Sequence, residues 1–203
     1  MPVKQHVKQA PMSSRFRGFL PIVVDVETSG LNAATDALLE VAIVPLSLKG
    51  GLLSPMAADH YHVQPFKGAH FDPEAMLLTG IDAHHPLRFA ISEHHALHRI
   101  SVRVRALLAE FRCQKAVLVG HNAWFDLGFM QAAVKRCHFR GFPFHSFTSF
   151  DTATLSGVAL GETVLAKALR AARIPFNVNL AHSAIYDAEK TAALFCHIVN
   201  HSL

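Results

Sequence analysis

Two carboxylates at the end of an apolar run are the first residues whose types and spacing can do chemistry. In the stretch PIVVDVETSGL, residues 21–31, four apolar residues lead into Asp25, and Glu27 follows two positions later. Side chains at positions i and i+2 of a strand point to the same face, so these acids are expected side by side. Like charges raise each other's pKa unless a cation lies between them. The pattern is typical of half of a Mg2+ site. The alternative is two unrelated acids at a solvent-exposed strand end, which would produce the same short motif.

Two later stretches each add an acid at the start of an expected helix. In GHNAWFDLGFM, residues 120–130, apolar residues at helical spacing place Asp126 near the first turn of a helix. The helix dipole favours a carboxylate at that position. Simple capping of the helix is the plainer explanation for this acid. In AHSAIYDAEKTAALFCHIVN, residues 181–200, His182 lies at the mouth of a helix and Asp187 in its first turns, a little over one turn away. We expect His182 and Asp187 to reach a common site.

Together, these residues have the composition of a two-metal hydrolytic centre. Four carboxylates can hold two divalent ions, and paired ions stabilise both the attacking and the leaving oxygen of phosphodiester cleavage. An imidazole titrates near neutral pH, so the histidine can take the proton from the attacking water. The residues are Asp25, Glu27, Asp126, His182 and Asp187.

The elements that must position these residues follow from apolar periodicity. An antiparallel meander of three early strands is expected, from the first acidic stretch, from EVAIVPL (40–46) and from DHYHVQP (59–65). A short helix follows between Asp72 and Gly80, and the clearest helix runs from about Ser92 to Phe111. The buried strand AVLVG (116–120) then leads into the second acidic stretch.

The composition indicates one compact domain. The chain has 203 residues, of which 51% are hydrophobic and 17% charged, and this balance excludes a largely disordered protein. No apolar run is long enough to span a membrane and the N-terminus lacks a signal peptide's apolar core, so a cytoplasmic location without membrane attachment is expected. Residues 1–14 lack apolar periodicity and are expected to form a flexible basic arm before a single domain at 15–203. The three cysteines are far apart and indicate neither a disulfide framework nor a thiolate metal site.

The formal charge of +4 suggests an anionic partner. Residues 127–150 contain no acid, and phenylalanines alternate there with Lys135, Arg136 and Arg140. This mixture is expected where bases stack and phosphates are neutralised, and equally in a solvated loop with a few packed phenylalanines.

The three acidic stretches resemble the motifs of a known family, the DEDDh 3′-to-5′ exonucleases. VDVETSG is similar to the first motif, HNAWFD to the second and HSAIYD to the third, with the histidine-to-aspartate spacing of the histidine-bearing subclass. The resemblance implies an α/β fold of the ribonuclease H-like type, with a mixed five-stranded sheet flanked by α-helices. It also implies two Mg2+ ions, with Mn2+ as a possible substitute, held by the four acids, and His182 as the general base.

A closer resemblance to one bacterial branch of that family covers residues 15–203. It implies a homodimer that trims short single-stranded 3′ tails of tRNA and other structured RNAs, with activity on single-stranded DNA ends as well. It implies that Phe125 and Phe147 stack on bases and that Glu74 contacts the 3′-terminal nucleotide. It further implies that basic residues hold RNA beside the partner subunit's active site, namely Arg15, Arg17 and Lys115.

Two positions depart from that branch. Leu31 and Leu78 stand where phenylalanine is usual, and leucine lacks the aromatic face that stacks on a base. We therefore expect looser binding of the 3′ end and weaker discrimination against terminal cytosine. Asp151 is a fifth nearby acid in the sequence, and we expect it to support the fold.

Two alternatives remain open from the sequence. One is another enzyme of the same superfamily, either a DNA proofreading exonuclease or an oligoribonuclease. The other is a non-catalytic RNA-binding module that keeps the fold, against which the presence of all five chemical residues argues.

Overall fold

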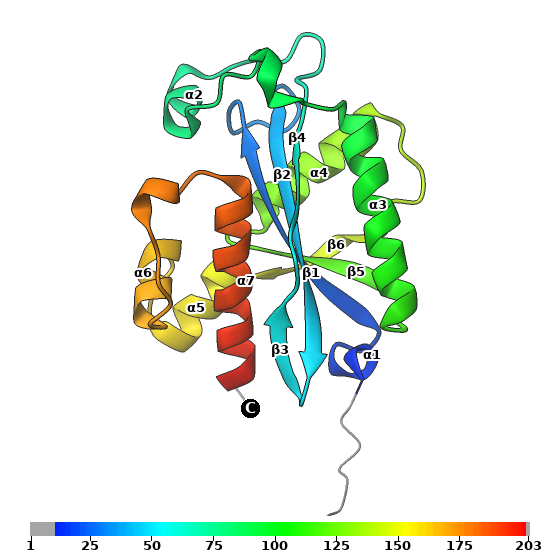
Figure 1. The fold of residues 1–203 in the computed structure, drawn as a ribbon, viewed down its shortest axis with the longest axis vertical. Helices are drawn as coiled ribbons and strands as arrows, with labels where there is room; N and C mark the ends of the chain where they lie inside the picture. The colour runs from blue at the N-terminus through cyan, green and yellow to red at the C-terminus, as the bar shows by residue number, and fades with distance from the viewer. Residues whose placement is uncertain (1–10, 202–203) are drawn as a thin grey trace, which may run out of the picture.

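A computed structural model describes residues 11–201 of the chain, and its centre is one mixed β-sheet (Figure 1). The central strand β1 (Phe19–Thr28) pairs antiparallel with β2 (Leu38–Lys49) on one side and parallel with β5 (Lys115–Gly120) on the other. Beyond β5 lies β6 (Phe144–Asp151), again parallel. The α/β class and the mixed sheet expected from the sequence are confirmed.

The sheet has six strands where five were expected. The reason is the length of β2, whose 12 residues pair with two short strands in succession. Its first half pairs antiparallel with β4 (Asp59–His62) and its second half with β3 (Leu52–Pro55). The four-residue β3 is too short to be separated from its hairpin turn by periodicity alone. The antiparallel order of the early strands is confirmed.

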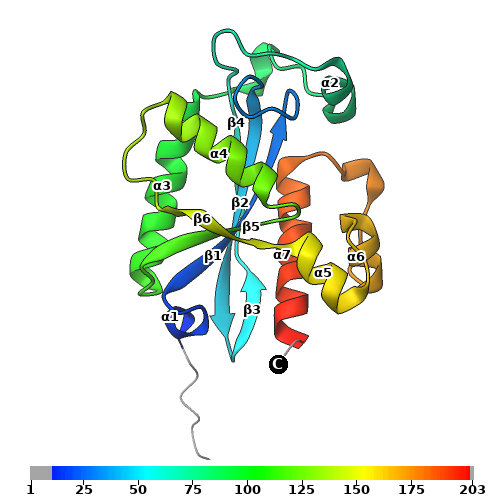
Figure 2. The same cartoon turned by 180° about the vertical axis from the view of Figure 1, so that it is seen from behind.

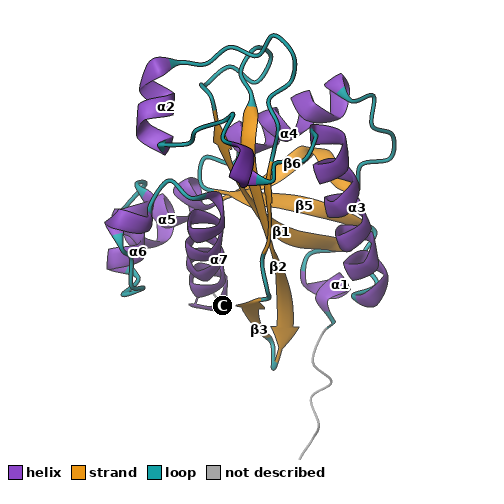
Figure 3. Cartoon of the chain, turned by 45° about the horizontal axis from the view of Figure 1, so that its top comes forward, coloured by secondary structure: helices purple, strands orange, loops and turns teal. Residues whose placement is uncertain are grey.

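Helices cover both faces of the sheet, as the two opposite views show (Figures 1 and 2). Helix α7 (Ala184–His201) packs across β1, β2 and β3, with α5 (Thr152–Leu160) and α6 (Leu165–Ala171) outside it. On the other face, α3 (Glu93–Glu110) lies beside α4 (Trp124–Arg136), and α4 contacts β1, β5 and β6. The small helix α2 (Pro73–Thr79) lies beyond the end of the sheet (Figure 3).

The sequence pattern explains how α7 is held. Ala188, Ala192 and Phe195 recur at helical spacing and are fully buried against the sheet, where the small residues let the helix approach the strands closely. The phenylalanine also contacts the rings of Phe16 and Phe150. This packing fixes the first turn of α7, where an expected site residue lies.

The N-terminal boundary differs from the expected one. Residues 1–10 of the expected flexible arm lie outside the described part of the chain. Residues 12–14 belong instead to a short helix, α1 (Met12–Arg15), because the side chain of Met12 is 3% exposed and packs into the core. None of the helices described at residues 11–201 is long and apolar enough to span a membrane.

Candidate active site

Two elements bring three carboxylates together on the α7 face of the sheet. Asp25 and Glu27 lie on one face of β1, as their spacing predicted, and Asp187 comes from the first turn of α7. One oxygen of each carboxylate lies within 4.8 Å of the others. Residues 162 positions apart in the chain thus form one acidic cluster at the end of the central strand.

A fourth carboxylate reaches the same strand end from the opposite layer. Asp126, in the first turn of α4, accepts a hydrogen bond from the backbone N–H of Val26 at 3.1 Å and is 4% exposed. Its approach depends on Gly120, the last residue of β5, since a Cβ there would lie 2.7 Å from Oδ2 of Asp126. The absence of a side chain at Gly120 therefore makes room for this acid.

The electrostatics of the cluster call for a cation. Burial, reinforced by the neighbouring acids, raises the pKa of Asp25 well above its ordinary value. Burial, followed by the charge of Asp187, raises the pKa of Glu27 to about 8, and burial raises the pKa of Asp126 to about 8. Carboxyl groups with pKa values raised in this way stay ionised at neutral pH only if positive charge compensates them.

The donor set also fits a hard divalent ion. Within residues 11–201, Oδ1 of Asp187 is buried and accepts no hydrogen bond, which leaves it free as a ligand. Carboxylate oxygens are the ligands that Mg2+ and Mn2+ prefer. The site can therefore hold a divalent metal through Asp25, Glu27 and Asp187, with Asp126 as a fourth carboxylate at the same strand end.

His182 lies at the edge of this cluster. Its backbone N–H donates to Oδ2 of Asp187 at 2.8 Å, and its side chain is exposed. The backbone of His182 has φ of 63°, a left-handed conformation that non-glycine residues rarely adopt and that costs free energy. The strained turn thus holds the backbone of His182 against Asp187 and leaves its side chain open to solvent.

Asp151 supports the fold, as expected. Its Oδ1 accepts hydrogen bonds from the backbone N–H groups of Asn122 at 2.8 Å and Ala123 at 3.3 Å, and its Oδ2 accepts from the N–H of Thr154 at 3.1 Å. Burial raises the pKa of Asp151, but a hydrogen bond from the Thr154 hydroxyl and these backbone hydrogen bonds outweigh it and hold the pKa below its usual range. The carboxylate caps α5 and ties it to the turn before α4, the helix that carries Asp126.

Sequence reasoning missed a second polar cluster on the neighbouring strands. Glu40 of β2 is the cross-strand partner of Glu27 and is 8% exposed. Its two carboxylate oxygens contact Nε2 of His60 at 3.1 Å and Nδ1 of His62 at 2.9 Å. The available signal was the H-x-H pattern within a strand, which puts both imidazoles on one face.

The residues expected to bind the 3′ end differ in exposure. Leu31, Leu78 and Phe147 are 82%, 61% and 87% exposed, which is unusual for large apolar side chains. Phe125 is half-buried and packs on the ring of Phe129 at 5.0 Å between centroids. Glu74 is exposed in the first turn of α2. These side chains can reach a ligand without rearrangement of the core.

The basic residues expected to hold RNA lie at the other end of the sheet. Lys115 begins β5 and pairs with Phe19 at the start of β1, six residues before Asp25. At about 3.3 Å per residue, this pairing puts Lys115 roughly 20 Å from the acids. Arg15 and Arg17 lie just before the same end of β1. These cations therefore do not contribute to the carboxylate cluster of their own chain.

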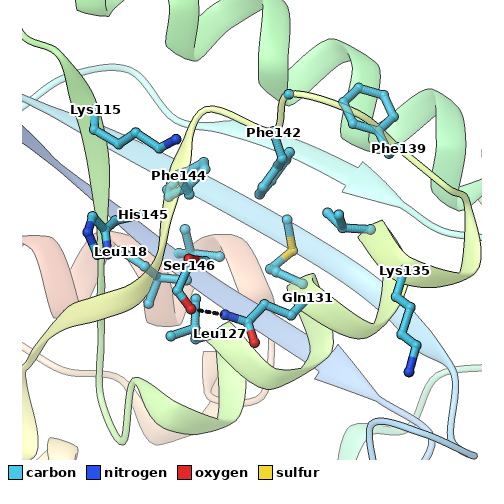
Figure 4. Close-up of a pocket in the computed structure, with 14 residues that line it drawn as sticks. Lys115, Leu118, Leu127, Gln131, Lys135, Phe139, Phe142, Phe144, His145 and Ser146 are labelled. Carbon is cyan, nitrogen blue, oxygen red and sulfur yellow. Dashed lines mark hydrogen bonds between the residues drawn. The ribbon is translucent and has the colours of Figure 1, made fainter.

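A separate cavity lies on the opposite face of the sheet (Figure 4). It has a volume of about 390 Å³ and lies between α4, β5 and β6. Its lining includes Val24, which precedes Asp25 and therefore points to the other face, as well as the stacked rings of Phe142 and Phe144, at 5.2 Å between centroids. The four carboxylates are not part of its lining.

Comparison with known proteins places this arrangement in a family. The family model described as Exonuclease matches residues 22–195. Ribonuclease T of Cronobacter sakazakii is 56% identical over 93% of this chain and 85% of its own length. Ribonuclease T of Yersinia enterocolitica is 54% identical over 93% of this chain and 88% of its own length.

Solved structures support the same fold at lower identity. Exonuclease I of E. coli, determined in complex with a dT13 oligonucleotide, superposes with a TM-score of 0.68 at 19% identity, covering 90% of this chain. This chain spans only 41% of that structure, so the likeness concerns the fold. The family model matches residues 22–195, and more than half of the aligned residues are identical to the two ribonucleases T. The chain therefore belongs to the exonuclease family and is a homologue of the bacterial ribonucleases T.

Proposed function

We propose that this exonuclease removes nucleotides from the 3′ end of RNA and trims short single-stranded tails of tRNA and other structured RNAs. The products are nucleoside 5′-monophosphates. The observation that carries the proposal is the convergence of four buried or half-buried carboxylates from β1, α4 and α7 at one end of the sheet. Sequence identity to the ribonucleases T supports RNA as the substrate.

In this proposal the four carboxylates, Asp25, Glu27, Asp126 and Asp187, hold two Mg2+ ions, and Mn2+ can take their place. When bound, such ions neutralise the acids and supply Lewis acidity to both oxygens of an in-line displacement at phosphorus. The protein supplies the position of the ligands. The backbone N–H of Val26 orients Asp126, and the N–H of His182 orients Asp187.

His182 acts as the general base. The backbone N–H of His182 is bonded to Asp187 and its side chain is exposed, so the imidazole can accept a proton from water and pass it to bulk solvent. Loss of the imidazole is expected to slow hydrolysis while metal binding persists.

Exposed and half-buried side chains around the site hold the 3′ end. Phe125 and Phe147 stack on bases, and Glu74 contacts the terminal nucleotide. Leu31 and Leu78 pack against the terminal base as wedges, with less affinity than an aromatic ring provides. Stacking does not depend on the sugar, so single-stranded DNA ends are also substrates.

The active enzyme is a homodimer in this proposal. Arg15, Arg17 and Lys115 lie roughly 20 Å from the acids of their own chain, by the strand rise. A second copy can place these cations beside the first copy's active site, where they bind the RNA backbone. The cytoplasmic location expected from the sequence is part of the same proposal.

A tailed hairpin RNA tests the proposed substrate. A 5′-labelled hairpin with a short 3′ tail is incubated with Mg2+ or with chelator, beside a dinucleotide and a single-stranded DNA of the same sequence. The proposal predicts a Mg2+-dependent ladder that stops near the duplex. Cleavage of the dinucleotide alone would indicate an oligoribonuclease, cleavage of DNA alone a DNA exonuclease, and binding without cleavage an RNA-binding module.

A further inference from the structure

The first candidate for an additional subsite is the exposed indole of Trp124, the first residue of α4. It is the only tryptophan in the chain, and it is 71% exposed although it is the largest apolar side chain. Trp124 lies two residues before Asp126, at the end of the helix that faces the acids. Its ring meets the half-buried Phe125 edge to face, with centroids 5.8 Å apart. Phe125 in turn packs on the buried Phe129, so the indole has a rigid support.

The surface beyond Trp124 is shaped for an extended chain. By helical spacing, Gly128, Ala132 and Lys135 follow Trp124 along one side of α4. These three residues line a hollow of about 630 Å³ together with Ala33, in the loop after β1. A Cβ at Gly128 would meet no atom within 4 Å, so the hollow is open there. Lys135 is exposed about 16 Å further along the helix axis and forms no salt bridge within residues 11–201.

We propose that Trp124 is a stacking subsite for a base upstream of the scissile bond, with the phosphates beyond it running along this hollow toward Lys135. The inference rests on the proposed function, because its ligand is the substrate of the same site. An exposed indole next to a metal-binding acid offers the aromatic surface that sequence-tolerant base stacking uses. It also offsets part of the stacking lost at Leu31 and Leu78.

The single tryptophan makes a direct test possible. Asp187→Asn protein, which is expected to bind without cleaving, is titrated with labelled RNA from a mononucleotide up to a short oligomer. Binding is followed by anisotropy of the label and stacking by quenching of tryptophan fluorescence. Quenching of the tryptophan is expected only when the RNA is long enough for an upstream base to reach Trp124. Binding without quenching would overturn the Trp124 assignment and leave the proposed function intact, whereas absence of binding would count against the proposed function itself.

Kinetics of two matched variants separate stacking from apolar contact. Trp124→Leu is expected to raise KM on a tailed RNA by roughly 5- to 100-fold with little change in kcat. Trp124→Phe, which keeps an aromatic ring, is expected to have a KM close to that of the wild type. Equal KM values for the leucine variant and the wild type would refute the subsite. A changed oligomeric state with unchanged KM would assign the indole to a protein interface instead.

An independent set of contacts carries a second inference, at the edge of the sheet. His60 and His62 project from one face of β4, and Glu40 projects beside them from the adjacent strand β2. One ligand atom of each lies within 4.8 Å of the others, and the imidazole centroids are 4.7 Å apart. All three residues are buried or half-buried, which limits competition from water.

We infer that Glu40, His60 and His62 form a binding site for a transition-metal ion such as Zn2+. Two imidazoles and one carboxylate are a common three-ligand set for zinc, and nitrogen ligands select zinc over Mg2+. The rigid strand pair already holds the donor atoms close together, so only small shifts are needed. The site differs in ligand type from the all-carboxylate cluster next to it.

Native mass spectrometry with zinc in excess Mg2+ tests this site. One Zn2+ per chain is expected in the wild type and in Asp187→Asn, and none in His60→Gln/His62→Gln. The thermal unfolding of the metal-free proteins serves as the folding control. Absence of bound zinc in the wild type, its retention in the histidine variant, or its loss in Asp187→Asn alone would overturn the inference.

Discussion

Replacement of Glu27 by glutamine is expected to stabilise the metal-free protein at pH 8 while it removes a ligand and abolishes activity. The pKa of Glu27 is raised from 4.5 to about 8, first by burial and then by the charge of Asp187. A carboxyl group whose pKa is higher in the folded state favours folding when protonated, and this contribution is lost as the pH rises toward 8. Ionisation of Glu27 at pH 8 therefore costs on the order of 4 kcal/mol, and at pH 4.5 less than about 0.5 kcal/mol.

The measurement is urea unfolding in chelator at both pH values. Glutamine resembles the protonated acid in shape and carries no charge, so Glu27→Gln is expected to raise the free energy of unfolding at pH 8 and to leave it nearly unchanged at pH 4.5. Glu110→Gln is the matched control, because Glu110 is exposed at the end of α3. A stability change in Glu27→Gln that is equal at the two pH values would refute the electrostatic reasoning.

Three further changes test other parts of the structure. Asp151→Ala is expected to destabilise the fold by about 2 kcal/mol, because it removes the cap of α5 and leaves backbone N–H groups without acceptors; a thermal midpoint equal to the wild type would contradict this role. Arg136→Ala is expected to lower the free energy of unfolding in urea by about 3 kcal/mol, because it leaves the buried Glu93 without its two guanidinium contacts at 2.6 and 3.1 Å. If the effects of Arg136→Ala and Glu93→Gln simply add in the double variant, the pair is not coupled. Leu31→Phe and Leu78→Phe together are expected to lower KM about 5-fold or more on a cytosine-poor tail, and an unchanged KM would refute stacking at these positions.

The sequence predicted the local placement of the acids better than their meeting point. Periodicity put Asp25 and Glu27 on one strand face and Asp126 and Asp187 in first turns, and the structure has all four there. Their convergence depends on how α4 and α7 pack on opposite faces of the sheet, which local patterns do not encode. The close approach of Asp126 depends on Gly120 in the neighbouring strand, a contact visible only in three dimensions.

The misses have physical causes as well. Met12 is followed by three polar residues, so periodicity gave no sign that its side chain packs into the core. Glu40 lies in a run that reads as a buried strand, and its polar partners come from β4, which is 20 residues further along. Cross-strand pairs of this kind depend on register, which the sequence alone does not specify here.

Cleavage of a tailed RNA under single-turnover conditions tests most directly whether these four carboxylates form the catalytic site. The variants are Asp25→Asn, Glu27→Gln, Asp126→Asn and Asp187→Asn, with Asp151→Asn as the matched control. Each of the four is expected to lower the Mg2+-dependent rate by at least about 100-fold, whereas Asp151→Asn keeps most of it once folded protein is quantified. Full activity in any of the four, or a loss in folded Asp151→Asn as large as in the others, would contradict the assignment.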